Sequence, residues 1–518
     1  MKKNTFRSTI AIAIATLFVQ VNLTTISAQT KTTSLLWGED GELWDSRGRL
    51  PDFTYAGYGG GYATKPSFTN TIDVTTQGVI PNDGLSDVAA IQTIINNAPD
   101  NSEIYFPAGR YVIDDHLTID RSNILIKGDG DSTNGTVFYM PKSATDINGS
   151  FENDFSVGAD GFMIHFVGVR HTYVAELTEE VFYGDTVIEV DDTRLISVGD
   201  IIELHADGDN PVNGELWDAY FNYQAADLPQ PLSSWLDGNG GNMFHTIEKI
   251  EGNLVTFREP LRLDLKPSWR IRLRTRRNNT TNVGIENIRL EFIETAKKTH
   301  HEEPGYNAVQ FENCTNFWAT DLSIVHADNG INLQRSSYGE ITDITFEGRE
   351  GHHGFKIGYS ALNLFSNIKF NNTKPYIHSG TLIHKSNGNV IRNVSGTQVI
   401  SLDFHKNPPF SNLWTDVRTE FNHKSTGSPT AGYHAGARNV YWGLFGESTA
   451  LYWARKNDFK ENWGMFQNTI VSGLDFSDTS EMFTEEREWY ENIPYEDLAD
   501  KDLYKLQKEY RAGHTPVV

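Results

Sequence analysis

The feature that most constrains the fold of this chain is a repeat of about 23 residues. An Asn or Asp followed by an aliphatic residue recurs as Asn287-Ile288, Asp321-Leu322, Asp343-Ile344, Asn367-Ile368, Asn393-Val394, Asp416-Val417 and Asn439-Val440. The aliphatic members are separated by 34, 22, 24, 26, 23 and 23 residues. Repeats of this size bury their apolar side chains only by stacking on their neighbours. The spacing fits one three-strand coil, so it predicts an all-β protein built as a parallel β-helix.

A second pattern keeps step with the first and predicts which side chains face outward. Four apolar residues lie 11 positions before their marker and a fifth lies 13 before: Phe311, Leu333, Ile357, Ile383 and Phe404. If these residues point inward, their sequence neighbours point outward and stack in columns from coil to coil. The column before them is Gln310, Asn332, Lys356, Leu382 and Asp403, and the column after them is Glu312, Gln334, Gly358, His384 and His405.

The segment between residues 78 and 130 resembles a known family. A turn at Gly78–Gly84 precedes Ser86, which can cap a helix with apolar positions at helical spacing from Val88 to Ile95. The short strands "FPAGRYVI" and "ILIKGDG" follow. This order resembles the opening of the pectate-lyase-like superfamily, which is shared with phage tailspikes. The resemblance implies a right-handed β-helix with an N-terminal capping helix, and a secreted carbohydrate-active enzyme.

Composition and local patterns divide the chain. A basic start, an apolar run at 9–19 and a small-residue exit at Ser27-Ala28 predict a signal peptide over 1–28 and a periplasmic or secreted protein. No later apolar run is long enough to predict a membrane-spanning helix. We expect an N-terminal cap and first coils at 29–171, an inserted small antiparallel β-domain at 172–264, main coils at 265–476 and a helical tail at 477–518.

The charge distribution favours an anionic sugar polymer as the partner. A net charge of −24 argues against nucleic acid as a partner. Cys314 is the single cysteine of the sequence, so no intramolecular disulfide is expected. Ten of the sixteen histidines lie between His300 and His434. A basic, imidazole-rich strip on an acidic protein suggests an anionic polysaccharide or its oligosaccharides. The oligomeric state is not predicted.

The columns carry the predicted active site. β-Elimination from a uronic acid needs a neutralised carboxylate, a base for the C5 proton and an acid for the leaving oxygen. The predicted catalytic residues are His384, His405, Lys356 and Asp403, with His405 or Lys356 as base and His384 as acid. The predicted substrate-binding residues are Arg335, Gln334, Asn332, Lys385, Lys406, His353, His434 and Arg438. The same chemistry can expel water from a terminal uronate, so an oligosaccharide dehydratase is a variant of this lyase.

Two other classes stay open. A glycoside hydrolase needs two suitably separated carboxylates, for which Asp328, Glu347, Glu350 and Asp416 are candidates. A non-catalytic sugar-binding rod would carry aromatic and amide side chains without coupled proton carriers.

No cofactor is expected from the sequence. The pairs His300-His301 and His352-His353 lack the spacing of a dedicated zinc site, so no metal site is predicted. Calcium is conceivable, but no acidic cluster has clear calcium spacing.

Overall fold

The computed structural model describes residues 31–149, 161–170, 172–206, 214–223, 242–277, 279–405, 407–420, 423–424, 435–446, 469–472, 483–484 and 489–513. The predicted signal peptide, Lys406 and His434 lie outside these residues. Within them, no helix combines the length and apolar character needed to cross a membrane.

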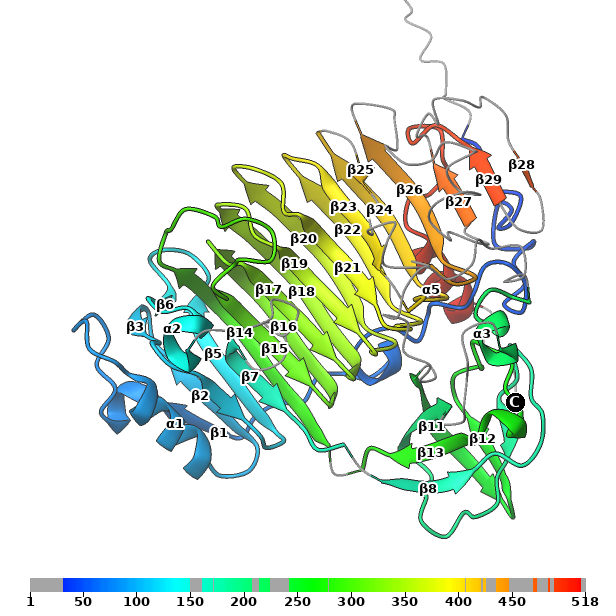
Figure 1. Ribbon diagram of the computed structural model, residues 1–518, viewed down its shortest axis with the longest axis horizontal. Helices are drawn as coiled ribbons and strands as arrows, with labels where there is room; N and C mark the ends of the chain where they lie inside the picture. Colours follow the sequence, from blue (N-terminus) through cyan, green and yellow to red (C-terminus); the bar gives the residue numbers. More distant parts are fainter. Residues whose placement is uncertain are drawn as a thin grey trace, which may run out of the picture.

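The body of the molecule is a right-handed parallel β-helix, as predicted (Figure 1). In the described part of the chain, one face is a 15-stranded sheet and another is an 8-stranded sheet. The larger sheet contains β1 (Asn70–Asp73), β2 (Ser102–Phe106), β3 (Gly109–Val112), β5 (Ile124–Gly130), β6 (Thr136–Met140), β14 (Thr280–Phe292), β16 (Cys314–Val325), β18 (Ser337–Gly348), β20 (Leu364–Asn372), β22 (Val390–Gly396), β24 (Leu413–Thr419), β26 (Val440–Gly446), β27 (Thr469–Ser472), β28 (Phe483–Thr484) and β29 (Trp489–Asn492). The smaller contains β4 (Leu117–Ile119), β7 (Phe162–Val167), β15 (Asn307–Glu312), β17 (Asn329–Gln334), β19 (His353–Gly358), β21 (His378–Ile383), β23 (Ile400–His405) and β25 (His423–Lys424).

The interior is filled by apolar side chains that stack from coil to coil. The rings of Phe166 and Phe311 are stacked with centroids 4.7 Å apart, and Phe346 stacks on Phe370 at 4.9 Å. Full burial of one such side chain contributes roughly 1.5–3 kcal/mol. Because each coil buries its apolar side chains against its neighbours, the stability of a coil depends on the coils on either side.

A ladder of buried asparagines lies at the turns that lead into β20, β22, β24 and β26 of the larger sheet. Asn363, Asn389, Asn412 and Asn439 are fully buried. The Nδ2 atoms of the first three donate to the Oδ1 atoms of the next members at 2.9, 2.9 and 3.1 Å. Side-chain amides thus continue the inter-coil hydrogen bonding through the turn.

The predicted register is right for four of the five coils and wrong at β21. Leu382 is paired with Ile357 and Phe404, so it takes the inward place assigned to Ile383. The connection to β22 is one residue longer here than in the preceding coils. Because side chains alternate along a strand, a shift of one residue exchanges the faces.

The capping helix α1 (Val88–Asn97) closes the N-terminal end as predicted, with Ile91 and Ile95 buried. Its N-cap is Asp87, whereas the Ser86 hydroxyl donates to Asp114 instead. The shorter helices are η1 (Tyr58–Gly61), η2 (Val74–Gln77), α2 (Ala144–Asn148), α3 (Glu215–Ala219) and η5 (Pro267–Trp269).

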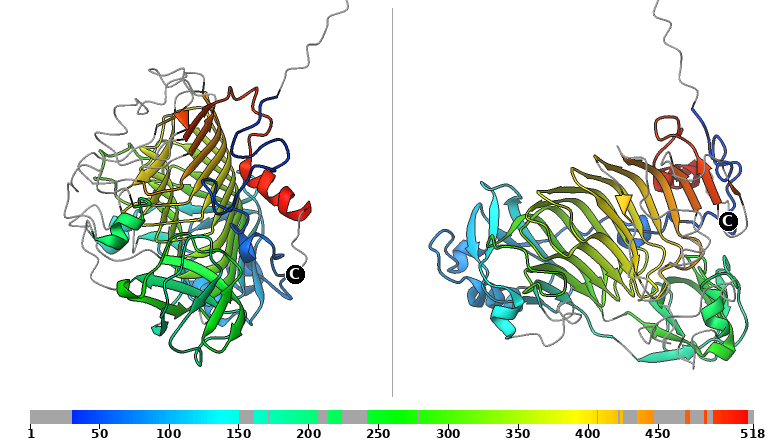
Figure 2. Two further views of the ribbon diagram at one scale, coloured as in Figure 1. Left: turned by 90° about the vertical axis from the view of Figure 1, so that its right-hand side faces the viewer. Right: turned by 45° about the horizontal axis from the view of Figure 1, so that its top comes forward.

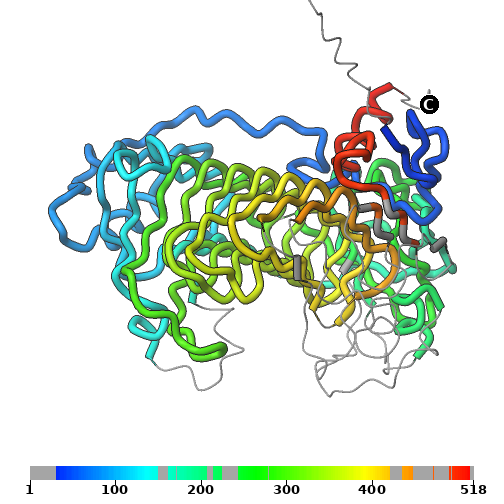
Figure 3. Tube along the Cα trace, turned by 90° about the horizontal axis from the view of Figure 1, so that it is seen from above, coloured from blue at the N-terminus to red at the C-terminus, as the bar shows by residue number. Residues whose placement is uncertain are grey.

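An N-terminal segment, residues 31–69, runs along the outside of the β-helix and is called the strap below (Figure 3). It begins beside the last coils, where Thr32 bridges to Leu498. It ends at β1, in the first coils. The helix α5 (Leu503–Gly513) packs against the strap (Figure 2), and Gln507 hydrogen-bonds to Phe53 N at 3.0 Å and to Pro51 O at 2.8 Å.

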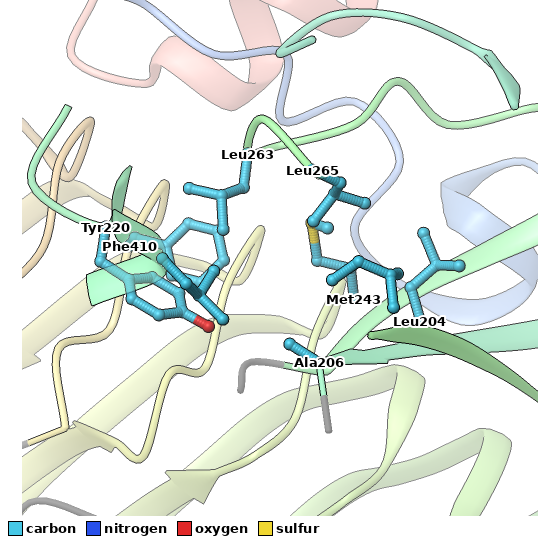
Figure 4. A pocket seen from close by; sticks show the side chains of 9 residues that line it. Leu204, Ala206, Tyr220, Met243, Leu263, Leu265 and Phe410 are labelled. Atoms are coloured by element: carbon cyan, nitrogen blue, oxygen red, sulfur yellow. The ribbon is translucent and has the colours of Figure 1, made fainter. Parts of the chain in front are cut away.

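An antiparallel sheet, with six strands among the described residues, lies beside the β-helix (Figure 1). It contains β8 (Tyr173–Glu176), β9 (Val187–Glu189), β10 (Ile201–Ala206), β11 (Asn242–Glu251), β12 (Leu254–Phe257) and β13 (Ile271–Thr275). The sheet therefore extends past the predicted boundary at 264, because β13 pairs with β8 and β10. A small pocket in its core is lined by apolar side chains such as Leu204, Met243 and Leu265, with the Tyr220 hydroxyl at one side (Figure 4).

Candidate active site

The outward face of the 8-stranded sheet carries two columns of side chains, of which the first is polar throughout. In register, one column is His165, Gln310, Asn332, Lys356, Thr381 and Asp403. The other is Val167, Glu312, Gln334, Gly358, Ile383 and His405. Of the four predicted catalytic residues, Lys356, Asp403 and His405 therefore lie in these columns and His384 does not. Asn332 Nδ2 donates to Gln310 Oε1 at 2.7 Å, which fixes both amides within the first column.

Asp403 lies at the centre of the polar cluster and is fully buried. Its Oδ2 accepts from the Thr381 hydroxyl at 3.1 Å and lies 2.9 Å from His378 Nδ1 and 3.5 Å from His405 Nδ1. Burial alone would raise the pKa of Asp403, but the adjacent imidazoles of His378 and His405 hold it well below its usual value. The carboxylate is therefore charged and orients both rings.

A chain of histidines continues from Asp403 past the first residues of β21 and β19. His378 stacks on His353 with ring centroids 5.0 Å apart, and His353 stacks on His352 at 4.3 Å. His352 contacts His300, with 3.3 Å between their Nε2 atoms, and His300 stacks on His301. Burial, together with the neighbouring histidines, lowers the pKa of both His300 and His352 to about 4, so both are neutral at pH 7.

Three of these stacked histidines have an oxygen atom close to Nδ1. His352 Nδ1 lies 3.5 Å from Glu303 Oε2, His353 Nδ1 lies 3.0 Å from Asn329 Oδ1, and His378 Nδ1 lies 2.9 Å from Asp403 Oδ2. An oxygen at Nδ1 favours the tautomer that carries the proton there and leaves the lone pair on Nε2.

The histidine chain was only partly anticipated. His353 was predicted to bind substrate, whereas His300, His301, His352 and His378 were not assigned to the site. The signal was present in the spacing, since Asn329, His353 and His378 follow one another at 24 and 25 residues, close to the coil period.

Other predicted residues lie at the turns that follow the strands. His384 has a left-handed backbone conformation (φ 54°) and stacks on Tyr359 at 4.6 Å, outside the columns. Arg335 lies over the same Tyr359 ring, with its guanidinium carbon 4.8 Å from the ring centroid. Burial lowers the pKa of Arg335.

Two predicted clamps contact the antiparallel domain instead of the histidine chain. Lys385 is fully buried, with Nζ 5.7 Å from the Tyr220 ring centroid. Arg438 lies over Tyr183 at 4.0 Å and donates to Asn222 at 2.9 Å. These positions favour a structural role for both cations, because their contacts join the β-helix to the domain.

The carboxylates suggested for a hydrolase do not converge. Asp328 is buried and paired with Arg349 at 2.8 Å, whereas Glu347 lies on the larger sheet and is paired with Arg289. Asp416 accepts from the Tyr495 hydroxyl at 2.6 Å, and Glu350 lies near Lys374. Near the histidines, Glu303 is held by Lys297 at 3.1 Å and by His352. These contacts, which outweigh the effect of burial, lower the pKa of Glu303 to about 2.

Residues 71–172 match the family described as rhamnogalacturonase A/epimerase, pectate lyase-like. The match covers the segment on which the resemblance was based. The fold and this match together confirm the pectate-lyase-like resemblance. No curated protein matches the chain.

Solved structures share the fold at low identity. The tailspike protein gp49 from Pseudomonas phage LKA1 is 14% identical with a TM-score of 0.50, over 77% of this chain and 64% of that one. A polygalacturonase from Erwinia carotovora is 10% identical with a TM-score of 0.34, over 83% and 94%. An iota-carrageenase complexed to iota-carrageenan fragments is 11% identical with a TM-score of 0.35, over 70% and 58%. At such identities the likeness concerns the fold alone.

Proposed function

We propose that the protein is a carbohydrate-active lyase that performs β-elimination on a uronate-containing, anionic polysaccharide or its oligosaccharides. The observation that carries this proposal is the buried carboxylate of Asp403 beside His405, with Lys356 in the same column. Proton carriers and a cation are what elimination requires. A hydrolase needs a pair of carboxylates instead, and those near the histidines are each engaged by a cation or an imidazole.

The bond changes assign roles to these residues. His405, oriented by Asp403, takes the C5 proton of the uronate. The electrons of the C5–H bond form the C4–C5 double bond, and the C4–O bond breaks with its electron pair on the departing oxygen, which takes a proton from solvent water. Lys356 offsets the charge of the uronate carboxylate, which makes the C5 proton more acidic. Asn332 and Gln334 offer amide groups to sugar hydroxyls on the neighbouring coil.

The test is to incubate the purified protein with uronate-containing and sulfated polysaccharides and oligosaccharides. Ultraviolet absorbance follows the new double bond conjugated to the carboxylate, and a second assay follows reducing ends. We expect absorbance to rise, and its ratio to reducing ends to separate chain cleavage from loss of water at a terminal uronate. Reducing ends without absorbance would favour a hydrolase, and silence in both assays would favour a binding rod.

The variant His405→Gln tests the base. We expect kcat to fall by roughly 10²–10⁴, the usual contribution of a general base, with KM little changed. His116→Gln is the control, because His116 lies on a distant turn where its Nδ1 contacts the Phe162 carbonyl at 2.8 Å. Unchanged turnover in a folded His405→Gln protein would contradict the assignment.

A further inference from the structure

The imidazoles of His352, His353 and His378 converge in a way that acid–base catalysis does not require. One ring nitrogen of each lies within 4.8 Å of one ring nitrogen of both others. Their Nδ1 atoms face Glu303, Asn329 and Asp403, at 3.5, 3.0 and 2.9 Å. The three imidazoles therefore lie close enough together for one cation to be bound among them.

We propose that His352, His353 and His378 form a binding site for a divalent first-row transition metal, with zinc as the reference ion. Three protein nitrogens with a remaining open position are typical of catalytic zinc sites. Ligating histidines characteristically donate their other ring nitrogen to a carboxylate or amide oxygen, which is the arrangement of Glu303, Asn329 and Asp403 here.

The setting of the triad also suits a metal. His352 and His353 are half-buried and His378 is buried. Each ligand is the first residue of a strand or precedes one, and the backbone pairing of His353 with His378 fixes their separation.

His300 borders the triad. Its Nε2 lies 3.3 Å from His352 Nε2, and two ligand nitrogens on one tetrahedral zinc ion, each bonded at about 2.0–2.1 Å, lie at about this separation. His352 also belongs to a second group, with His300 and His301, in which one ring nitrogen of each residue lies within 4.8 Å of the others. His300 is exposed, which favours the triad as the metal site.

The ligand chemistry selects the class of ion. Imidazole nitrogens suit zinc, copper, nickel and iron, whereas calcium prefers oxygen ligands. From the sequence, no metal site was predicted and calcium stayed open. The cluster of three imidazoles favours a transition metal over calcium. In the reaction, the metal would bind the uronate carboxylate beside His405 and Lys356; this role rests on the proposed function.

Metal binding is tested on the full mature protein after treatment with a chelator and dialysis. Zinc content is measured by mass spectrometry, affinity by competition with a chromogenic chelator, and geometry by the visible absorption of bound Co²⁺. We expect one equivalent of metal and the absorption of a nitrogen-rich site. His353→Gln and His378→Gln should each lower the affinity at least 100-fold, and Asn329→Ala should lower it by about 10–100-fold.

The controls separate a built site from adventitious binding. His116→Gln should bind as the wild type does, and so should His301→Gln, which alters only the outer group. Thermal unfolding and circular dichroism identify any variant that has not folded, and the wild-type stoichiometry stands independently of the variants. Equal affinity in wild type and folded His353→Gln, loss of binding in His301→Gln, or less than one equivalent in the wild type would each overturn the proposal.

The two proposals fail in distinguishable ways. Metal bound with the predicted spectrum but no double-bond product on any uronate substrate would contradict the lyase and leave the metal site. Product formation by a wild-type protein that binds less than one equivalent of metal would contradict the metal site and leave the lyase.

Discussion

Buried charges in the antiparallel domain illustrate how single residues are stabilised in this protein. Glu203 on β10 and Arg276 after β13 are both fully buried, with Glu203 Oε2 3.3 Å from Arg276 Nε. Arg170 approaches the other carboxylate oxygen at 3.3 Å. Burial would raise the pKa of Glu203, but Arg276 and Arg170 lower it, so the carboxylate is charged where it joins the domain to the segment leaving β7.

Glu203→Gln is therefore expected to destabilise the protein by about 3–5 kcal/mol at pH 7, because it leaves Arg276 buried without its counter-charge. Since the folded pKa of Glu203 is depressed, its contribution is present above the ordinary glutamate pKa of about 4.3 and is lost as the pH falls through the lower folded value. Urea unfolding at pH 7 and at acid pH should show the gap between variant and wild type narrowing. Glu251→Gln, on the exposed end of β11, is the control, and an equal effect at both pH values would contradict this reasoning.

At the same scale, the sequence predicted the outward positions of Lys356, Asp403 and His405 but not the histidines that contact Asp403 and its neighbours. Outward positions follow from the alternation of side chains along a strand, so the sequence predicts them wherever the coil length is constant. His384 was misplaced because one longer turn after β21 shifted the register. His352 and His378 lie next to strand starts, where alternation gives no direction for a side chain.

At the scale of elements, the asparagine ladder ties four consecutive coils together. The first three amides each donate to the asparagine of the next coil, and Asn389 also donates to the Ser360 carbonyl at 3.1 Å. Repeat proteins derive their stability from such nearest-neighbour contacts, so a defect in one rung weakens two interfaces.

Replacement of Asn389 by Ala should cost about 1–3 kcal/mol for each buried polar group that it leaves unsatisfied. Thermal or urea unfolding measures the loss. The matched control is Asn371→Ala on β20, because Asn371 is exposed and a surface change is usually within about 0.5 kcal/mol. Similar stabilities for the two variants would show that the ladder does not hold the coils.

The elements of the β-helix were largely predictable because the 23-residue period is imposed by the coil itself. The capping helix was predictable from its apolar spacing. The end of the antiparallel sheet was not predictable. No pattern in the sequence distinguishes β13 (Ile271–Thr275), which belongs to this sheet, from a strand of the β-helix. Three asparagines of the ladder were not singled out, although Asn363, Asn389 and Asn412 each lie four residues before a marker of the repeat. The fourth, Asn439, was assigned as a marker itself, but Val440 pairs with Leu413 and not with Val417.

At the scale of the whole molecule, the strap joins the two ends of the β-helix. Glu491 accepts hydrogen bonds from Ser34 and Leu35 beside the last coils, whereas Tyr58 donates to Asn282 in the earlier coils at 2.7 Å. Between them, Arg511 pairs with Asp52. The strap therefore depends on α5 along the middle of its path.

Gln507→Leu should loosen this junction, because it leaves the Phe53 amide and the Pro51 carbonyl without their buried partner. We expect faster amide exchange at residues 50–56 and new proteolytic cleavage in the strap, with little change in the central coils. The exposed Glu509→Gln, on the same helix, should behave as the wild type does. Protection of residues 50–56 in a folded Gln507→Leu protein would disprove the dependence on α5.

The contact between strap and helix also sets an order of events during synthesis. Residues 50–56 are translated about 450 residues before residues 503–511, which hold them. The strap must therefore wait, with Leu50 and Phe53 uncovered, while every coil is made and stacked. Closure of this junction is expected to be a late step of folding, and a chain that stops before α5 would expose the same apolar residues to chaperones and proteases.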